Sequence, residues 1–423
     1  MSDKLAKEKP VVHEDEKLAA FVRDLALKDY KPPSGLSFAS QVKYGWLREA
    51  GSLLWIDTGD ASAAEKVWAY ETQALTTNNA LVDQVVQTGV MDGLIALAAR
   101  EIRKVSPHIS EQEMVYEIGF LVNAKLALSL VEKFGAHVSV ELHPDMAFNQ
   151  AGTLAFARRY YQINPEHFYI KVPFTKDGLP AARVLSRENI PVNLTIGFSA
   201  RQNYLAARFS NPSFVNVFLG RLNSLVEENS LGKPENVGEK AALASDEMMK
   251  NLRSSGAAKT NQIAASIRSG QQVADLAGMD VLTIPPQHAA EYLAMDISRD
   301  DIQYKDWRDL DVNLQANGPV EPRDFDALWQ IDEKFVSFVD DVMKKADTIE
   351  TGDELKELAD QHEVKLFHDW TSEEREKIRN QGKIPKTSDW PGIALDTLMN
   401  MAALEFFAHD QIEVDERIRS LIS

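Results

Sequence analysis

The chain has 423 residues, of which 44% are hydrophobic and 26% are charged, so a globular protein with a large core is expected. Its formal net charge of -18 argues against non-specific binding to nucleic acid or to an anionic membrane, and the absence of cysteine excludes disulfides, thiol nucleophiles and zinc–thiolate sites. Residues 1–17 are charged and lack the apolar core of a signal peptide, and no apolar run reaches about 18 residues. A cytoplasmic protein with no membrane-spanning helix is therefore expected.

The first elements predicted along the chain are helices. Residues 1–12 are expected to be disordered. An amphipathic helix is predicted over residues 14–30 from the helical spacing of its apolar positions, Leu18, Phe21, Val22, Leu25 and Leu27. Pro32, Pro33 and Gly35 end this helix, and a second, short helix is predicted over residues 37–50.

From residue 53 onward, short apolar runs alternate with helical segments. The runs predicted as strands cover residues 53–57, 74–78, 138–141, 169–172, 192–196, 214–219, 262–267 and 281–284. Two helices, over residues 80–100 and 111–134, are predicted between the second and third runs. Eight alternating units predict a (β/α)8 TIM barrel with a parallel sheet. The alternative is a doubly wound open sheet, which usually carries a glycine-rich phosphate loop where this chain has Asp57-Thr58-Gly59-Asp60.

After about Pro286 the strand pattern stops, and the remaining chain is predicted to be mostly helical. Its clearest helices are predicted over residues 325–346 and 395–422, and a loop is predicted over residues 382–392. The predicted organisation is an α/β barrel catalytic domain over residues 46–300, an N-terminal helical extension over residues 1–45 and a C-terminal helical region over residues 301–423 that packs on the barrel. The apolar positions of the last helix, Leu395, Leu398, Met401, Leu404 and Phe407, predict a core helix or a cover on the barrel. A lid over the active site and a dimer contact are the alternatives, and the sequence leaves a homodimer open.

A lysine interrupts the fourth apolar run, Phe168-Tyr169-Ile170-Lys171-Val172-Pro173-Phe174. Strand alternation places Lys171 on the face opposite to Phe168, Ile170 and Val172. Burial favours the neutral amine, which is the form that attacks carbonyl carbons in Schiff-base enzymes. The alternative is a lysine on an edge strand whose ammonium group extends to water.

Other reactive side chains fall at or near the C-terminal ends of the predicted strands. They are Asp57, Asn78, Glu141, Asn193, Thr195 and Arg221. In a barrel of this type that face carries the active site. Each residue alone has an ordinary explanation, since Asp57 could cap a helix, Asn78 could belong to a turn and Arg221 could form a surface ion pair. Their joint occurrence at successive strand ends favours an active site.

Seven segments in this region have the order and approximate spacing of a known set of motifs. They are Ile56-Asp57-Thr58-Gly59-Asp60, Thr76-Thr77-Asn78, Val138-Ser139-Val140-Glu141, Ile170-Lys171-Val172, Asn193-Leu194-Thr195, Phe218-Leu219-Gly220-Arg221 and Ala265-Ser266-Ile267-Arg268. Through them the chain resembles the transaldolase family from about Leu53 to Pro286. The resemblance implies an enzyme without metal or organic cofactor that transfers a dihydroxyacetone unit from a ketose, such as fructose 6-phosphate or sedoheptulose 7-phosphate, to an aldose acceptor.

The resemblance also implies a role for each motif residue. Lys171 would form the Schiff base with the ketose, and Asp57 would take the proton from its C4 hydroxyl. Glu141, together with Thr195, would hold a water that carries protons during imine formation and hydrolysis. The substrate-binding residues that the resemblance implies are Asn78, Asn193, Asn216, Phe218, Ser266, Arg221 and Arg268, of which the two arginines would bind the sugar phosphate.

Departures from the family pattern leave the exact sugar open. Asn216 stands where the family usually has a serine, Asn79 replaces a proline, and Glu141 is followed by Leu142-His143-Pro144. The substrate could therefore be a sulfonated or otherwise unusual sugar, and His143 could be either a solvent-side residue or a substrate contact. Phe218 resembles the transferase-type residue, whereas tyrosine is typical of related aldolases that release free dihydroxyacetone. Such an aldolase and a non-catalytic barrel used for assembly are the remaining alternatives.

Overall fold

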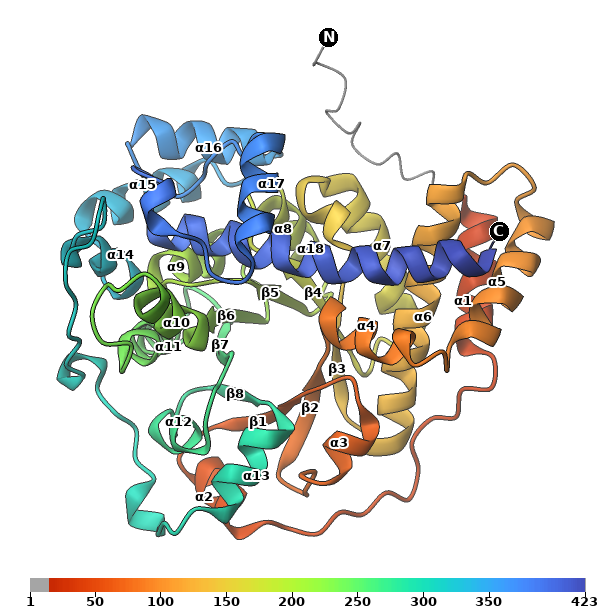
Figure 1. The fold of residues 1–423 in the computed structure, drawn as a ribbon, viewed down its shortest axis with the longest axis horizontal. Coiled ribbons are helices and arrows are strands. Elements are labelled where there is room, and N and C mark those ends of the chain that lie inside the picture. Colours follow the sequence, from red (N-terminus) through yellow and green to blue (C-terminus); the bar gives the residue numbers. More distant parts are fainter. Residues whose placement is uncertain (1–14, 423) are drawn as a thin grey trace.

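The structure, a computed structural model, describes residues 15–422, so the prediction for residues 1–12 lies outside the described residues. Its centre is a closed barrel in which eight parallel strands follow one another in chain order (Figure 1). The strands are β1 (Leu53–Asp57), β2 (Thr72–Thr76), β3 (His137–Glu141), β4 (Phe168–Pro173), β5 (Val192–Thr195), β6 (Phe214–Phe218), β7 (Asn261–Ala265) and β8 (Val281–Ile284). The predicted (β/α)8 barrel is confirmed, and the doubly wound alternative is wrong.

Strand ends differ from their predicted positions where the backbone turns away from the sheet. β2 lies two residues earlier than predicted, because Thr77 and Asn78 form the turn that starts helix α4 (Asn79–Gln87). β5 and β7 end one and two residues early, because Ile196 and Ser266 have positive φ angles of 56° and 66°. A β-branched residue such as Ile196 is uncommon in this conformation, and such strain concentrates at functional sites.

Strand alternation divides the inside of the barrel into layers. In the lower layer Trp55 stacks on Tyr169 with ring centroids 5.5 Å apart and meets the Phe214 ring edge-on at 4.8 Å. Residues two positions further along the same strands point to the same side. The layer above this aromatic floor therefore contains Asp57, Lys171 and Asn216. β4 pairs with β3 on one side and β5 on the other, so the edge-strand explanation of Lys171 is wrong.

Helices surround the barrel and precede it. They are α1 (Glu16–Leu27), α2 (Val42–Glu49), α3 (Ala61–Glu65), α4, α5 (Asp92–Val105), α6 (Glu111–Phe134), α7 (Gln150–Ile163), α8 (Gly178–Arg187), α9 (Ala200–Phe209), α10 (Leu219–Glu228), α11 (Val237–Ser254), α12 (Gly270–Asp275) and α13 (Pro286–Ala294). The single helix predicted over residues 80–100 is wrong. The chain bends between α4 and α5, where Gly89 has a φ of 79° that a helix interior does not allow.

Helix α6 is long and apolar enough to span a membrane by length and composition alone. However, 83% of its most apolar window is buried inside the protein. A capping box between Ser110 and Glu113 starts the helix, and Gly135 in the left-handed conformation follows its last residue. Its apolar length is thus explained by packing within this chain.

The C-terminal region is helical, and its last helix lies across the mouth of the barrel (Figure 1, blue). Its helices are α14 (Asp326–Trp329), α15 (Glu333–Lys344), α16 (Gly352–Gln361), α17 (Ser372–Gln381) and α18 (Leu395–Ile422). The helix predicted over residues 325–346 is interrupted between α14 and α15, and the loop predicted over residues 382–392 contains one short 3-10 turn, Thr387–Asp389.

Two sets of polar contacts hold α18 over the C-terminal ends of the strands. The Asn400 side-chain amide donates hydrogen bonds to the carbonyl oxygens of Phe174 and Ile196, at 2.9 and 2.8 Å, just beyond β4 and β5. At the other end of the helix the Asp415 carboxylate lies 3.3 Å from His143, which follows β3. We refer to α18 as the roof helix because it closes the face on which the predicted site residues lie.

Candidate active site

Lys171 and Glu141 form a buried pair at the centre of the barrel mouth. They stand opposite each other in the register of β4 and β3, and both side chains are less than a tenth exposed. The Lys171 Nζ atom lies 3.2 Å from Glu141 Oε2 and donates a second hydrogen bond of 3.1 Å to the carbonyl oxygen of Thr77. A buried amine beside one carboxylate has both a proton acceptor and a fixed direction for attack on a carbonyl carbon.

Asp57 lies on the inner side of β1 and belongs to the same group. The Thr76 hydroxyl donates a hydrogen bond of 2.7 Å to Asp57 Oδ1 and lies 2.8 Å from the Thr283 hydroxyl. The helix-capping explanation of Asp57 is wrong, because Asp60 accepts the capping hydrogen bonds at the start of α3. Asp57 is thus left to face the barrel mouth with one oxygen held in place.

Burial raises the pKa of both carboxyl groups. For Glu141 the desolvation is opposed by the charge of Lys171 and its hydrogen bond, and for Asp57 it is opposed by the Thr76 hydroxyl and by the charges of Lys171 and Arg268. Carboxyl groups with raised pKa values hold a proton more readily near neutral pH than ordinary ones do. Two such groups next to one amine are able to exchange protons with a reacting substrate.

A chain of amide and hydroxyl groups covers the β5 and β6 side of the site. The Asn216 amide donates to Asn193 Oδ1 at 2.7 Å, and the Asn193 amide donates to the Ser139 hydroxyl at 2.9 Å. Asn216 also donates to the Leu194 carbonyl at 3.0 Å, so its amide group fixes Asn193 in position. The Thr195 hydroxyl is buried and has no hydrogen-bond partner among residues 15–422, which leaves it free to bind a water or a substrate hydroxyl.

Arg221 is held at the start of α10 among aromatic rings. Its guanidinium carbon lies 5.9 Å from the Phe218 ring centroid and 5.0 and 5.2 Å from those of Phe406 and Phe407 on the roof helix. Arg221 is only 4% exposed, and its Nη1 atom has no hydrogen-bond partner in the described part of the chain. Burial, reinforced by the charge of Arg268, lowers the pKa of Arg221 to about 10.

The site residues coincide with the region that is similar to known proteins. The model of the transaldolase/fructose-6-phosphate aldolase family matches residues 54–347, which is well over half of the chain. The chain belongs to this family. The match extends beyond Pro286, where the resemblance inferred from the sequence ends, and α16, α17 and the roof helix lie outside it.

Curated members of the transaldolase family are similar to this chain over comparable lengths. A transaldolase of Prochlorococcus marinus subsp. pastoris is 28% identical over 243 residues, which are 56% of this chain and 72% of the relative. A transaldolase of Xanthomonas euvesicatoria pv. vesicatoria is 29% identical over 257 residues, 59% of this chain and 77% of the relative. Family membership and these names support a transaldolase or aldolase function.

Within this family member, the predicted catalytic residues all lie at the C-terminal ends of barrel strands, Asp57 on β1, Glu141 on β3, Lys171 on β4 and Thr195 on β5. Asn78 has a structural task as well, because its side-chain oxygen accepts a hydrogen bond from the Leu81 backbone and caps α4. Its amide nitrogen is left to donate to a substrate. His143 is mostly buried and contacts Asp415 and Tyr116, so the solvent-side explanation is wrong.

Several residues of the site were not singled out from the sequence. Thr76 and Ser139 lie inside the quoted motifs, but only the position of their hydroxyl groups next to Asp57 and Asn193 reveals their task. Phe407 lies with its ring centroid 5.8 Å from Lys171 Nζ, and this contact comes from a segment outside the family match. Among residues 15–422, no three side chains of His, Asp or Glu are grouped so that they could hold a metal ion.

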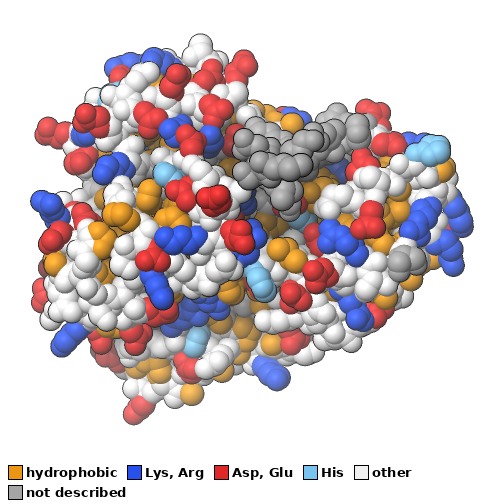
Figure 2. Space-filling model, turned by 45° about the horizontal axis from the view of Figure 1, so that its top comes forward, with side chains coloured by type: hydrophobic (Ala, Val, Ile, Leu, Met, Phe, Trp, Pro, Cys, Tyr) orange, Lys and Arg blue, Asp and Glu red, His pale blue; other side chains and the backbone are white. Residues whose placement is uncertain are grey.

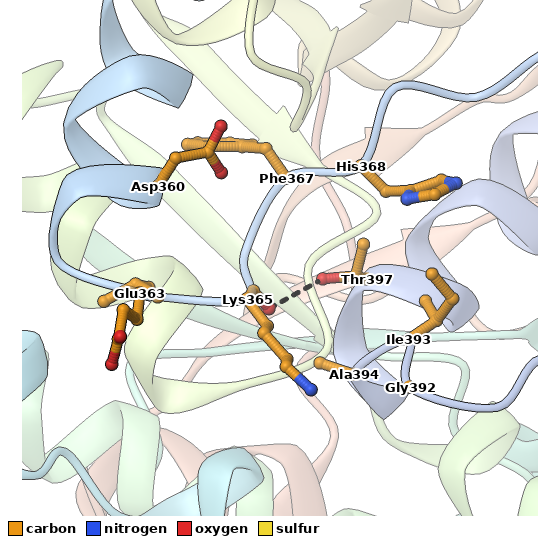
Figure 3. A pocket seen from close by; sticks show the side chains of 10 residues that line it. Asp360, Glu363, Lys365, Phe367, His368, Gly392, Ile393, Ala394 and Thr397 are labelled. Carbon is orange, nitrogen blue, oxygen red and sulfur yellow. Dashed lines mark hydrogen bonds between the residues drawn. The ribbon is translucent and has the colours of Figure 1, made fainter.

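A separate pocket lies in the C-terminal region, where Figure 3 shows side chains of α16, the following segment and the start of the roof helix. Its volume is about 330 Å³, and its lining includes Lys365, His368 and Thr397. The Thr397 hydroxyl donates a hydrogen bond to the Lys365 carbonyl, which ties two walls of the pocket together. No strand-end residue lines it, so the chemistry argued above belongs to the barrel mouth.

Replacement of Gly220 by alanine is expected to destabilise the protein by about 1–3 kcal/mol, because a crowded site cannot take up an added methyl group. A Cβ atom at Gly220 would lie 2.1 Å from the Ser266 carbonyl oxygen and 2.8 Å from Arg268 Nε. The matched control is Gly45→Ala inside α2, where a Cβ atom would meet nothing within 4 Å. The control is expected to keep or slightly raise the thermal midpoint, and equal midpoints for both variants would contradict the crowding.

Proposed function

We propose that this chain is a Schiff-base transaldolase, which transfers a dihydroxyacetone unit from a ketose phosphate to an aldose acceptor. The observation that carries the proposal is the buried pair of Lys171 and Glu141, with the carboxyl group of Asp57 on the same face of the barrel. A non-catalytic barrel has no need of a desolvated amine between two carboxyl groups, because each of these groups is costly to bury.

In the first stage, Glu141 takes a proton from Lys171, and the amine then attacks the C2 carbonyl carbon of the ketose. The carbinolamine that forms loses its hydroxyl group as water, and the protonated imine remains. Glu141 supplies and recovers the protons of these steps, with a water held by the free Thr195 hydroxyl as the carrier. The imine nitrogen is then positively charged and attracts the electrons of the neighbouring bond.

In the second stage, the Asp57 carboxylate takes the proton from the C4 hydroxyl group. The C3–C4 bond breaks, its electron pair moves to the enamine on Lys171, and an aldehyde leaves. Asn193, whose amide is fixed by Asn216 and Ser139, and Asn78 hydrogen-bond the hydroxyl groups of the three-carbon unit. The enamine then attacks the carbonyl carbon of an acceptor aldehyde, and hydrolysis of the new imine releases the product.

The direct experiment is reduction with borohydride in the presence of fructose 6-phosphate. We expect a covalent adduct that carries one reduced dihydroxyacetone or hexose unit, found by mass spectrometry of the intact chain. No adduct under any donor concentration would overturn the proposed mechanism.

Transfer, rather than release of free dihydroxyacetone, is favoured by Phe218 and by the roof helix. Phe218 places an apolar ring against Phe198 and Phe407 where a tyrosine would offer a hydroxyl group to water. With fructose 6-phosphate alone we expect slow release of free dihydroxyacetone. With an aldose phosphate such as erythrose 4-phosphate as acceptor, we expect turnover to rise by about tenfold or more, because the acceptor replaces water at the enamine. Equal rates with and without acceptor would identify a free aldolase.

A further inference from the structure

A lysine outside the barrel lies beside the two predicted phosphate-binding arginines. Lys383 is in the loop after α17, which Gly382 ends with a φ of 79°. Asn229 ties this loop to α10, because its side-chain oxygen accepts a hydrogen bond of 2.8 Å from the Thr387 backbone and its amide donates one of 3.1 Å to the Pro385 carbonyl. Arg221 is in the first turn of the same helix, α10. One helix therefore fixes both cationic residues.

The roof helix brings the two cations against one aromatic ring. Lys383 Nζ lies 4.7 Å from the Phe406 ring centroid, and the Arg221 guanidinium carbon lies 5.0 Å from the same centroid. Next to Phe406, the fully buried Glu405 binds Arg375 and Arg379 of α17 at 2.5 and 2.6 Å, so α17 cannot slide along the roof helix. The position of Lys383 is thus set by the fold on both sides.

Lys383 and the two arginines lack an ion-pair partner within the part of the chain that the structure describes. Among residues 15–422, no carboxylate forms an ion pair with Arg221, Arg268 or Lys383. Burial, reinforced by the charges of the two arginines, lowers the pKa of Lys383, so the three cations are close enough to repel one another. The Asp410 carboxyl group is within electrostatic reach of Lys383 and Arg221, but burial raises its pKa and its Oδ2 atom has no hydrogen-bond partner in the described chain.

Three mutually repelling cations around a buried, unpartnered guanidinium nitrogen are costly unless an anion joins them. The chain as a whole carries a net charge of -18, so this local excess of positive charge is opposite in sign to its surroundings. The cluster is therefore suited to a ligand that brings more than one negative charge to the same point.

We propose that Lys383 is a third phosphate ligand, which makes the site select ketoses with a dianionic phosphate over those with a monoanionic sulfonate. This inference rests on the proposed function, since it names the substrate class of the same site. A phosphate monoester carries a charge of roughly -1.5 to -2 near neutral pH, whereas a sulfonate carries only one negative charge. Coulomb attraction scales with the charge of the ligand, so an added cation attracts a dianion about twice as strongly as a monoanion at the same distance.

The test compares Lys383→Gln with the native enzyme on three donors, fructose 6-phosphate, 6-deoxy-6-sulfofructose and fructose. For fructose 6-phosphate we expect the KM to rise by about tenfold or more with little change in kcat, because one charge-assisted hydrogen bond is lost. For the sulfonate the rise is expected to be smaller, and for fructose the KM is expected to stay the same. Inorganic phosphate is expected to inhibit the variant more weakly by a similar factor.

Two further variants make the result specific. Lys386→Gln, in the same loop, removes an exposed charge outside the cluster and is expected to leave all KM values unchanged. Lys383→Arg keeps the charge and is expected to retain most of the preference for phosphate. The proposal is overturned if Lys383→Gln leaves the KM for fructose 6-phosphate unchanged, or raises the KM for fructose by the same factor.

A wrong role for Lys383 can be distinguished from a wrong proposed function. If native enzyme forms the borohydride adduct with fructose 6-phosphate and Lys383→Gln has unchanged KM values, only the role of Lys383 is wrong. If native enzyme forms no adduct with any of the three donors, the Schiff-base function is wrong, and with it the substrate class inferred for Lys383.

Discussion

The Lys171→Met variant is expected to lose at least about 10⁴-fold in turnover, as enzymes do when their covalent nucleophile is removed. Methionine has a similar length and fits the apolar surroundings, so the barrel is expected to keep its fold. The amine, however, is the atom that binds the C2 carbon of the donor, and no other lysine contacts Glu141 among the described residues. Borohydride reduction with fructose 6-phosphate is expected to leave the variant without a covalent adduct.

A matched control for this prediction is Lys176→Met. Lys176 lies five positions further along the chain and forms ion pairs with Asp353 and Asp369. It is expected to keep both the adduct and turnover, because its ammonium group faces carboxylates of the C-terminal region. If Lys171→Met still formed the reduced adduct, another amine would be the nucleophile and the assignment of Lys171 would be wrong.

The Asp57→Asn variant is expected to separate imine formation from carbon–carbon bond cleavage. Loss of the group that takes the C4 proton is expected to lower kcat about 10²–10⁴-fold, the usual contribution of a general base. Lys171 and Glu141 are unchanged, so borohydride should still trap the donor, now as the uncleaved hexose adduct. Mass spectrometry distinguishes this adduct from the three-carbon one. A three-carbon adduct formed at the native rate would show that another group takes the proton.

The same variant is expected to be more stable than the native protein near neutral pH. Burial raises the pKa of Asp57 above the 3.8 of an ordinary aspartic acid. Folding therefore favours the protonated form of Asp57. Its contribution to the free energy of unfolding is fully present below the pKa that Asp57 has in the unfolded chain. This contribution is lost as the pH rises through the pKa that Asp57 has in the folded protein. Asparagine stays neutral and still accepts the Thr76 hydrogen bond. We expect a gain in unfolding free energy at about pH 7 that disappears at about pH 4.

Urea unfolding at both pH values measures this difference. Asp60→Asn serves as the control, because Asp60 lies at the surface and asparagine caps helices as well as aspartate does. No gain for Asp57→Asn at the higher pH would mean that its carboxylate is well solvated in the folded state.

The barrel could be predicted from the sequence because each strand carries its own local pattern. A short apolar run followed by a helical segment repeats eight times, and polar residues at the ends of most of these runs mark the same face of the barrel. The strand ends at Ile196 and Ser266 could not be predicted, because the left-handed backbone there is imposed by neighbouring strands and helices. The break between α4 and α5 was missed for a similar reason, since one glycine inside a helical pattern does not by itself require a bend.

The upper half of the site could not be predicted in the same way. Phe407 and Lys383 are separated in sequence from Lys171 and Arg221 by well over a hundred residues, and neither has a local motif. Their place depends on the path of the C-terminal helices over the barrel. The sequence predicted a cover or a lid in general terms, but it could not show which side chains face the amine and which face the arginines.

The two hydrogen bonds of Asn400 have a consequence for the smallest active form of this protein. The amide of one residue on the roof helix holds both the carbonyl that follows β4 and the strained Ile196 that follows Thr195. A chain cut before residue 395 would keep all eight strands and every motif residue, yet Ile196 would be released from its strained backbone and Thr195 would lose its fixed direction. The shortest piece that contains every motif residue and the shortest piece that we expect to catalyse are then different lengths of the same polypeptide.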